Sequence, residues 1–583
     1  MGNSSPCPSS FVPYLFSMPW RVEESEPLSR PSGIMTTVAW VLREMGLVAT
    51  LDAMLAWDPK QCKLSPGVRL LALVLSVLFD RTALWRVDRV FARQDLPILF
   101  GPGVEATDFN DDALGRALDK LAQARPAHVF ASVAANVWAH EQVPFDSLHG
   151  DTSAVALYGA YEDPGPDVLQ IVRGYSKDHR SDLKQIGLGF VSSPEGIPLL
   201  GDIHDGNLSD NTWNHRVIKE LAKALPEETL RSILYCADCK VVTPENLLAM
   251  DKGGIHWLSR LPETYDAATT LKLKAWAAGG WDEPAAVSPR PPAARYRLCV
   301  FSDVALSANP EHPLAELRYR CVVVHSTALE ARALARQRRL VAEERQALNE
   351  ALTDRQTFPT TEEAMAAGSK LLTKLKLRYH TLQIATAPIA VPGKRPKGRP
   401  RKDAPSPPPV IRFIWDPTVA APGPEQLQKE IQLRSTFVLV TNDPRRSPRE
   451  LLATYKRQQT AVEIPFHQTK ALPVAPMFLD RPERVRAMGY VLLMAYTAFA
   501  VLQRRVRHAL AETPQPLISF DNRRNPAPTG AVILAHLAEV HTDIVQENGE
   551  TTRIVKVSRT ARHLLELLGV PFEAFVLPHA SSP

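Results

Sequence analysis

Residues 143–153 read VPFDSLHGDTS, and the pattern of the chain changes at this point. Before it, apolar residues recur at helical spacing; after it, short apolar runs bounded by turn residues predict strands. The run Ser147-Leu148-His149 leads into Asp151, so we expect this acid on a strand. Strands that carry acids and alternate with helices favour an α/β core built on a central sheet.

Two further acids lie in comparable settings. Asp238 follows the apolar run Ile233-Leu234-Tyr235, and Glu463 lies beyond a helix that Ser447-Pro448 is predicted to open. Carboxylates are the protein ligands that Mg²⁺ prefers. Three of them can hold two metal ions about 3.5–4 Å apart, which is the arrangement that serves phosphoryl transfer. If Asp151, Asp238 and Glu463 meet in space, we expect them to bind two Mg²⁺ (or Mn²⁺) ions.

Other segments predict the elements around these acids. Val68–Phe79 reads as a buried helix entered through Ser65-Pro66-Gly67, and residues 188–192 and 198–203 read as a hairpin. The remaining expected elements are a helix over 211–224, two antiparallel strands over 296–301 and 317–325, a long charged helix over 328–352, and a strand over 437–442. The pattern indicates helices first and a mixed sheet afterwards.

Composition narrows the class of protein. At 583 residues and 45% hydrophobic content the chain can form several cores, so global disorder is excluded. The net charge of +5 fits a nucleic-acid partner without requiring one. Scattered cysteines and the absence of a signal-peptide pattern favour the cytoplasm. The most apolar run, residues 488–502, is short for a membrane span, so we expect a buried helix and no membrane partner.

A basic, Pro-rich linker is expected over residues 391–409. Within it GKRPKGRPRK (393–402) resembles an AT-hook, whose arginines enter a narrow minor groove. Arg399 and Arg401 are therefore candidate DNA contacts. Short basic Pro-rich runs are also common as plain linkers, and that interpretation stays open.

Several motifs together resemble a known protein family. They are HGDTS with Tyr158-Gly159, the string GYSKDHRSDLKQ (174–185), Gly206-Asn207 with Asp210, Ala237-Asp238 with Glu245-Asn246-Leu247, and Tyr455, Gln459, Val462-Glu463, Phe466 and Lys470. In this order they resemble the DDE transposases of bacterial insertion sequences. Within these, the chain is most similar to the insertion-sequence-four-like superfamily, in the branch around insertion sequence sixteen thirty-four.

The resemblance implies an RNase H-like catalytic core interrupted by a β-containing insertion domain, with an N-terminal helical domain. Asp151 would lie on the first strand of the core, Asp238 after the fourth, and Glu463 on a later helix. The expected segments are 1–34 (disordered), 35–142 (helical, DNA-binding), 143–261 (first part of the core), 262–435 (insertion), 436–510 (second part of the core) and 511–583 (C-terminal helical region).

The resemblance also implies DNA contacts around the acids. Tyr455, Arg457 and Lys470 would contact phosphates near Glu463, although Tyr455 could equally be a core aromatic and Lys470 part of a structural ion pair. The polar string offers Lys177, Arg180 and Lys184, which could instead belong to a solvated hairpin. His149 is expected to be structural rather than a metal ligand.

The function expected on this basis is transposition, a form of DNA recombination. The enzyme would act as a metal-dependent endonuclease at terminal inverted repeats, then join the 3′-hydroxyl to target DNA, as a homodimer on paired ends. Two departures keep a decayed or repurposed DNA-binding protein open: Gln458-Gln459 stand where the wider superfamily has an Arg, and Pro465 follows Glu463. A nuclease that never joins strands also stays open, as does a zinc enzyme using His149, Cys236 and Cys239.

Overall fold

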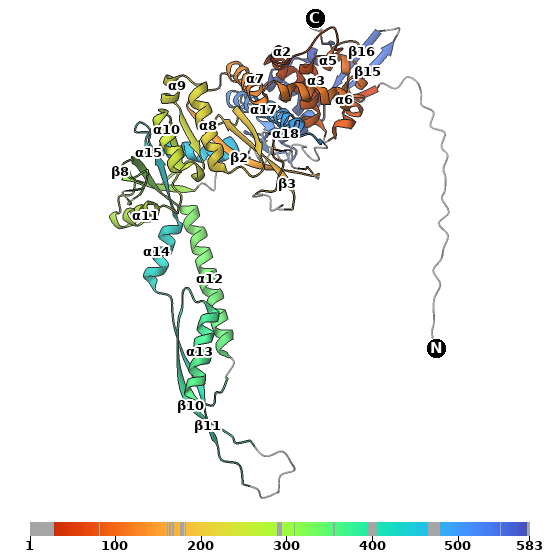
Figure 1. The fold of residues 1–583 in the computed structure, drawn as a ribbon. Coiled ribbons are helices and arrows are strands. Elements are labelled where there is room, and N and C mark those ends of the chain that lie inside the picture. Colours follow the sequence, from red (N-terminus) through yellow and green to blue (C-terminus); the bar gives the residue numbers. More distant parts are fainter. Residues whose placement is uncertain are drawn as a thin grey trace, which may run out of the picture. The chain divides into compact units, whose positions relative to one another are not determined.

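The computed structural model describes residues 28–80, 82–159, 161–162, 165, 168–174, 180, 182–287, 294–307, 309, 311–353, 356–394, 405–464, 479–547 and 550–579. The chain divides into two compact units. The terminal unit joins Met1–His140 to Lys470–Pro583, and the central unit is Glu141–Thr469. Each is described by itself below (Figure 1).

The terminal unit is mainly helical. Its first part comprises β1 (Leu28–Pro31), α1 (Gly33–Glu44), α2 (Leu47–Met54), α3 (Pro66–Phe79), η1 (Leu84–Arg86), α4 (Val87–Phe91), α5 (Leu96–Phe100), η2 (Ala106–Phe109), α6 (Asp111–Gln123) and α7 (Pro126–His140). Its second part comprises α17 (Pro482–Glu512), β13 (Leu517–Ile518), β14 (Arg524–Asn525), α18 (Gly530–Leu537), β15 (His541–Glu547), β16 (Glu550–Lys556), α19 (Arg559–Leu568) and η5 (Phe572–Phe575). Within the segment expected to be disordered, β1 pairs with β15.

Helix α17 is the centre of the terminal unit. It packs against α3, α6, α7 and α19, and Arg484 on it forms a two-pronged ion pair with Asp119 of α6. By length and composition α17 could cross a membrane, but 89% of its most apolar window is buried within the protein. The expected buried helix over 488–502 is therefore confirmed. We expected it within the second part of the core, yet its contacts belong to the N-terminal helices.

The central unit is built on one large mixed sheet. Its first elements are β2 (Ser147–Leu157), β3 (Lys184–Ser192), β4 (Pro198–Asp205), α8 (Asp210–Ala224), α9 (Glu227–Ser232), β5 (Leu234–Ala237), η3 (Cys239–Val241), α10 (Pro244–Lys252), β6 (His256–Arg260), α11 (Asp266–Ala278), β7 (Ala285–Ala286) and β8 (Arg295–Ala305). The later elements are β9 (Arg318–Ser326), α12 (Thr327–Thr353), α13 (Thr361–Leu375), β10 (Thr381–Val391), β11 (Val410–Ala420), α14 (Pro424–Arg434), β12 (Thr436–Thr441), α15 (Pro448–Gln458) and the π-helical turn η4 (Gln459–Glu463).

The sheet order is β4-β3-β2-β5-β6-β12-β9-β8-β7. Strands β2, β5 and β6 run parallel, whereas β2-β3-β4 form an antiparallel meander. The predicted hairpin is confirmed as β3 and β4, and the predicted antiparallel pair as β8 and β9. That pair does not form a sheet of its own, because β12 joins β9 to β6 and so extends the central sheet.

Between β9 and β12 the chain forms a helix-and-hairpin insert. Strands β10 and β11 pair antiparallel over their whole length, from Thr381↔Ala420 to Val391↔Val410. Helix α13 packs along this hairpin (Figure 1). The Trp415 indole of β11 donates to the carbonyl of Ala364 in α13. The charged helix expected over 328–352 is α12, which packs against α14. Residues 395–404 of the basic linker, including Arg399 and Arg401, lie outside the described residues.

The start of α15 is fixed by a capping box. The Ser447 hydroxyl accepts from the backbone N–H of Glu450, and the Glu450 carboxylate accepts from the N–H of Ser447. Replacing Ser447 with alanine should lower the free energy of unfolding by about 1 kcal/mol, because the backbone N–H of Glu450 loses its acceptor at the helix start. The measurement is the shift of the urea-unfolding midpoint. Ser232→Ala, which removes a hydroxyl at the end of α9, is the matched control, with an expected change within about 0.5 kcal/mol.

Candidate active site

Asp151 and Asp238 occupy equivalent positions on neighbouring parallel strands. In the β2–β5 pairing Gly150 stands opposite Ala237, so the two acids follow directly from paired residues. Asp151 continues along β2, and Asp238 is the first residue after β5. Because both strands run in the same direction, the acids lie at one level of the sheet.

Both side chains point to the sheet face that α15 covers. His149 and Cys236 are paired in register, and each contacts α15: His149 bonds to Gln458, and Cys236 packs with two leucines of that helix. Side chains two residues apart on a strand share a face. Asp151 and Asp238 therefore face the helix that leads to the third expected acid.

Glu463 ends the π-helical turn η4, which continues α15. This turn packs on β2 and β3, and the Ser192 hydroxyl donates to the carbonyl of Ala461 at 2.8 Å. π-Helical turns inside helices occur frequently at functional sites. Burial lowers the pKa of Lys456, as does the charge of Arg260, while Glu463 opposes both effects. Glu463 thus lies on an element anchored to the strand of Asp151.

The metal-ligand geometry is less complete than expected. Among the described residues, no three His, Cys, Asp or Glu side chains converge as a metal-binding group. The structure brings Asp151 and Asp238 to adjacent strand positions and holds Glu463 on the covering element. The same finding gives no support to a zinc site of His149, Cys236 and Cys239, since Cys236 is fully buried in the core.

Gln458 ties α15 to the strand of Asp151. Its amide nitrogen donates to the carbonyl of Gly150 at 3.0 Å, and its oxygen bonds to Nδ1 of His149 at 2.8 Å. Both side chains are buried. His149 is therefore structural, as expected. The role of Gln458 was not anticipated, because the sequence marked this position only as one that lacks an arginine.

Gly150, between His149 and Asp151, is required by close packing. A Cβ at this position would lie 2.3 Å from the hydroxyl oxygen of Tyr235. That hydroxyl donates to the side-chain oxygen of Asn214 on α8 at 3.1 Å. The glycine therefore lets a β5 side chain cross the opposite face of β2, directly behind the acid.

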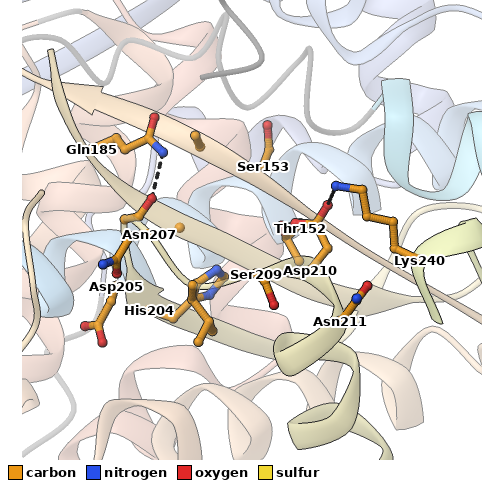
Figure 2. A pocket seen from close by; sticks show the side chains of 14 residues that line it. Thr152, Ser153, Gln185, His204, Asp205, Asn207, Ser209, Asp210, Asn211 and Lys240 are labelled. Carbon is orange, nitrogen blue, oxygen red and sulfur yellow. Dashed lines mark hydrogen bonds and ion pairs between the residues drawn. The ribbon is translucent and has the colours of Figure 1, made fainter. Parts of the chain in front are cut away.

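A polar pocket lies at the start of α8, and Thr152 and Lys240, which follow the two acids in the chain, are among the residues that line it (Figure 2). Its cavity volume is about 400 Å³, and residues of β2, β3 and β4 and the start of α8 line it. Asp210 accepts from the Thr152 hydroxyl at 3.1 Å and from the Lys240 ammonium at 2.8 Å. Thr152 follows Asp151, and Lys240 lies two residues after Asp238. Asp210 thus links the chain segments that carry the two acids.

Backbone hydrogen bonds hold the carboxylates themselves. Asp151 Oδ1 accepts from the N–H of Thr152 at 2.7 Å, and Asp238 Oδ1 accepts from the N–H of Lys240 at 3.0 Å. The Ser259 hydroxyl of β6 donates to the carbonyl of Asp238 at 2.9 Å. The hydrogen bond from Lys240 to Asp210 raises the pKa of this lysine, which keeps it cationic beside the site.

The predicted DNA-contacting residues are placed differently from one another. Tyr455 packs against the core cluster of the sheet and burial raises its pKa, so its ring is a core aromatic. Arg457 is exposed, 3.8 Å from the Asp146 carboxylate. Arg180 is exposed and pairs with Asp182, while Lys184 of β3 donates to the Tyr161 carbonyl. Lys177, Lys470 and Pro465 lie outside the described residues.

The buried His149 predicts a pH dependence of stability. Burial lowers its pKa from 6.5 to about 4, although the hydrogen bond to Gln458 works in the opposite sense. Between these pH values the unfolded chain binds a proton that the folded chain does not, so stability falls as the pH is lowered through this window. The loss amounts to about 3 kcal/mol at most. In urea unfolding against pH, His149→Asn, which keeps a donor near Nδ1, should show a shallower slope; equal slopes would contradict this assignment.

Comparison with known protein families gives a match in the terminal unit. Residues 32–135, from α1 into α7, match a family described as a domain of unknown function (DUF4277). This domain is found in transposase-like proteins. The matched part covers the N-terminal helices and none of the acids. No curated protein matches the chain.

Proposed function

We propose that this protein is a DNA transposase of the DDE type, which cuts DNA at the ends of an insertion element and joins the freed 3′-hydroxyl to target DNA. The observation that carries the proposal is the parallel register of Asp151 and Asp238 beneath the helix that leads to Glu463. Carboxylates at one level of neighbouring strands suit a reaction in which charge develops on phosphate oxygens.

The topology around the acids supports this proposal. Counted along the chain within β4-β3-β2-β5-β6, Asp151 lies on the first strand and Asp238 follows the fourth, as the family resemblance implies for these acids. Helices α8 and α9 connect β4 to β5, and α10 lies between β5 and β6. Fold alone does not establish function, so the proposal rests on the acids in their register.

The two aspartates suit a magnesium site in chemical type, while among the described residues no third His, Cys, Asp or Glu side chain converges with them. Mg²⁺ is usually held by one or two carboxylates together with substrate phosphates, and Asp151 and Asp238 supply two hard oxygen donors on adjacent strands. Glu463 is the third candidate ligand. Bound Mg²⁺ or Mn²⁺ would supply activation of a water or hydroxyl nucleophile and neutralise charge on the phosphate.

The chain's own residues position this chemistry. Gln458 fixes the backbone of Gly150 next to Asp151, and Asp210 links Thr152 to Lys240, so both strand ends are braced before DNA arrives. In the cutting step water attacks the scissile phosphorus, leaving a 3′-hydroxyl and a 5′-phosphate. In the joining step that 3′-hydroxyl attacks a target phosphodiester and displaces a target 3′-hydroxyl. No covalent bond to the protein is needed, because positioning and electrostatics supply the catalysis.

The test is cleavage of a DNA fragment that carries an element end, with Mg²⁺, by the wild type and by Asp238→Asn. We expect the variant to lose cleavage by about 10³-fold or more, since the neutral amide is a much weaker ligand and charge partner. Asp202→Asn, on β4 of the same sheet, is the matched control and should cut normally. Cleavage retained in Asp238→Asn would contradict the assignment.

The competing functions give different results in the same assay. Linkage of product 3′-ends to target DNA separates a transposase from a nuclease that only cuts. Specific binding without cutting by the wild type would indicate a non-catalytic DNA-binding protein, which the lack of a three-ligand group among the described residues favours. Action in the cytoplasm as a homodimer on paired ends belongs to the proposal as well.

A further inference from the structure

On β6, the strand next to β5, Arg260 occupies the position equivalent to that of Asp238. Strand β6 runs parallel to β5 with Cys236 opposite Leu258, so Arg260 stands at the level of Asp238. Leu258 packs in the same core cluster as Cys236, under α15. Since Arg260 follows Leu258 by two residues, it shares the face of the acids. Moving across β2, β5 and β6, this level of the sheet presents two acids and then an arginine.

Lys456 of the covering helix α15 lies near Arg260, next to the same aromatic ring. The Lys456 ammonium lies 5.3 Å from the centroid of the Phe437 ring, and the Arg260 guanidinium carbon lies 5.7 Å from it. Both cations therefore flank one aromatic side chain of β12. The charge of Glu463 acts on Lys456, which connects this pair to the third candidate acid.

Beyond Arg260 a cleft of about 620 Å³ opens between β6, α11 and α14. Five cationic side chains line it: Arg260, Lys272, Arg378, Lys429 and Arg434. The carboxylates in its lining are Glu263 and Glu430. Five positive charges against two negative ones leave an excess of three positive charges, so the cleft carries a positive potential.

The ion pairs in the cleft leave this excess in place. Glu263 accepts from both Arg260, at 3.0 Å, and Lys272, at 2.6 Å. Glu430 likewise accepts from both Arg378 and Arg434, each at 2.8 Å. Each carboxylate is thus shared between two cations. This arrangement orients the guanidinium groups without neutralising them, as suits an anionic ligand with several charges.

We infer that this cleft binds the phosphodiester backbone of the DNA strand that leads to Asp238. The inference rests on the proposed function for the identity of the strand, while the binding itself follows from the charges. Arginine suits such a track because its planar group contacts phosphate oxygens in pairs. Arg260 stands in register with Asp238. A phosphate bound by Arg260 would therefore be the neighbour, along the DNA strand, of the phosphate bound at the acids.

The experiment measures DNA affinity of the full chain against salt concentration, with EDTA present so that no cutting occurs. The probe is a labelled DNA duplex of arbitrary sequence, because phosphate binding does not depend on sequence. We expect the slope of log K against log salt to become shallower by about 0.9 for each phosphate that the protein no longer binds. The variants are Arg260→Gln, Lys429→Gln and the double variant, whose slope should fall by about 1.8.

A matched control separates this cleft from the overall charge. Lys223→Gln with Arg231→Gln removes two positive charges from α8 and α9, near the start of β5 and so at the opposite strand end from the acids. This control should leave the slope unchanged. An equal effect of both double variants, or no binding by the wild type, would overturn the inference.

The outcome is independent of catalysis. A shallower slope in the cleft variants supports the inference even when no preparation cuts DNA, and in that case the proposed enzymatic function fails alone. The opposite result is also possible: the wild type cuts DNA, Asp238→Asn does not, and the salt slope of the cleft variants is unchanged. That result overturns the inference about the cleft and leaves the proposed enzymatic function in place. Lys429 is exposed, so Lys429→Gln provides a readout that does not depend on the fold of the β6 end.

Discussion

Replacing Asp151 with alanine will abolish both cutting and joining of DNA, by about 10³-fold or more, and leave binding to the element end largely intact. The reason is local. Asp151 supplies one of two carboxylates at the same level of adjacent parallel strands, whereas the DNA contacts that we propose, in the cleft beside Arg260, belong to other residues. Cleavage and strand-transfer assays measure the loss, and a binding assay with the same fragment measures what remains.

A cysteine at the same position makes the test specific for metal binding. Asp151→Cys offers a soft thiolate, which suits Mg²⁺ poorly and accepts more thiophilic ions such as Mn²⁺ better. We therefore expect no cutting with Mg²⁺ and partial recovery with Mn²⁺. Position 151 is preferable to 238, because Cys236 and Cys239 already flank Asp238. Recovery by Mn²⁺ in Asp151→Ala as well would mean that Asp151 does not act as a ligand.

Local signals predicted the elements that carry the acids. The run before Asp151, the apolar segment before Asp238 and the cap at Ser447 each act within a few residues, and β2, β5 and α15 follow them. The hairpin of β3 and β4 was equally local. What places Asp151 beside Asp238 is the parallel pairing of β2 with β5, and the order of the acids along the chain indicated it only through the family resemblance.

These local signals did not predict which distant strands pair or which helices pack together. The alternating pattern of β8 and β9 identified two antiparallel strands, but only β12, far along the chain, connects them to the central sheet. Likewise the apolar pattern of α17 predicted burial without saying which helices would cover it. Burial and strand type follow from periodicity, whereas the partner of a strand or helix depends on contacts that a window of sequence does not contain.

Gln458 illustrates the same limit at the level of one side chain. In the sequence it stood out only as a departure from the pattern of the family. Its function depends on two partners more than three hundred residues earlier in the chain, His149 and the carbonyl of Gly150. Because both partners are buried, the amide is the group that satisfies them, and this predicts a large effect of removing it.

Replacing Gln458 with methionine should therefore lower the free energy of unfolding by about 2–6 kcal/mol, since two buried polar groups lose their partners at about 1–3 kcal/mol each. Methionine has nearly the same length and volume, so the change isolates the hydrogen bonds. The matched control is Gln459→Met on the neighbouring exposed side chain, with an expected change within about 0.5 kcal/mol. Urea unfolding of the three proteins provides the comparison.

Cleavage kinetics decide whether this bridge serves catalysis as well as stability. Gln458 holds the backbone immediately before Asp151, so its loss should displace that carboxylate relative to Asp238 and reduce kcat even at temperatures where Gln458→Met remains fully folded. KM should change little, because the side chain is buried and does not reach DNA. A variant with normal kcat and reduced stability would limit Gln458 to a structural role. A lower kcat with unchanged KM would make it a positioning residue, and would explain how this chain can be active with glutamine where an arginine was expected.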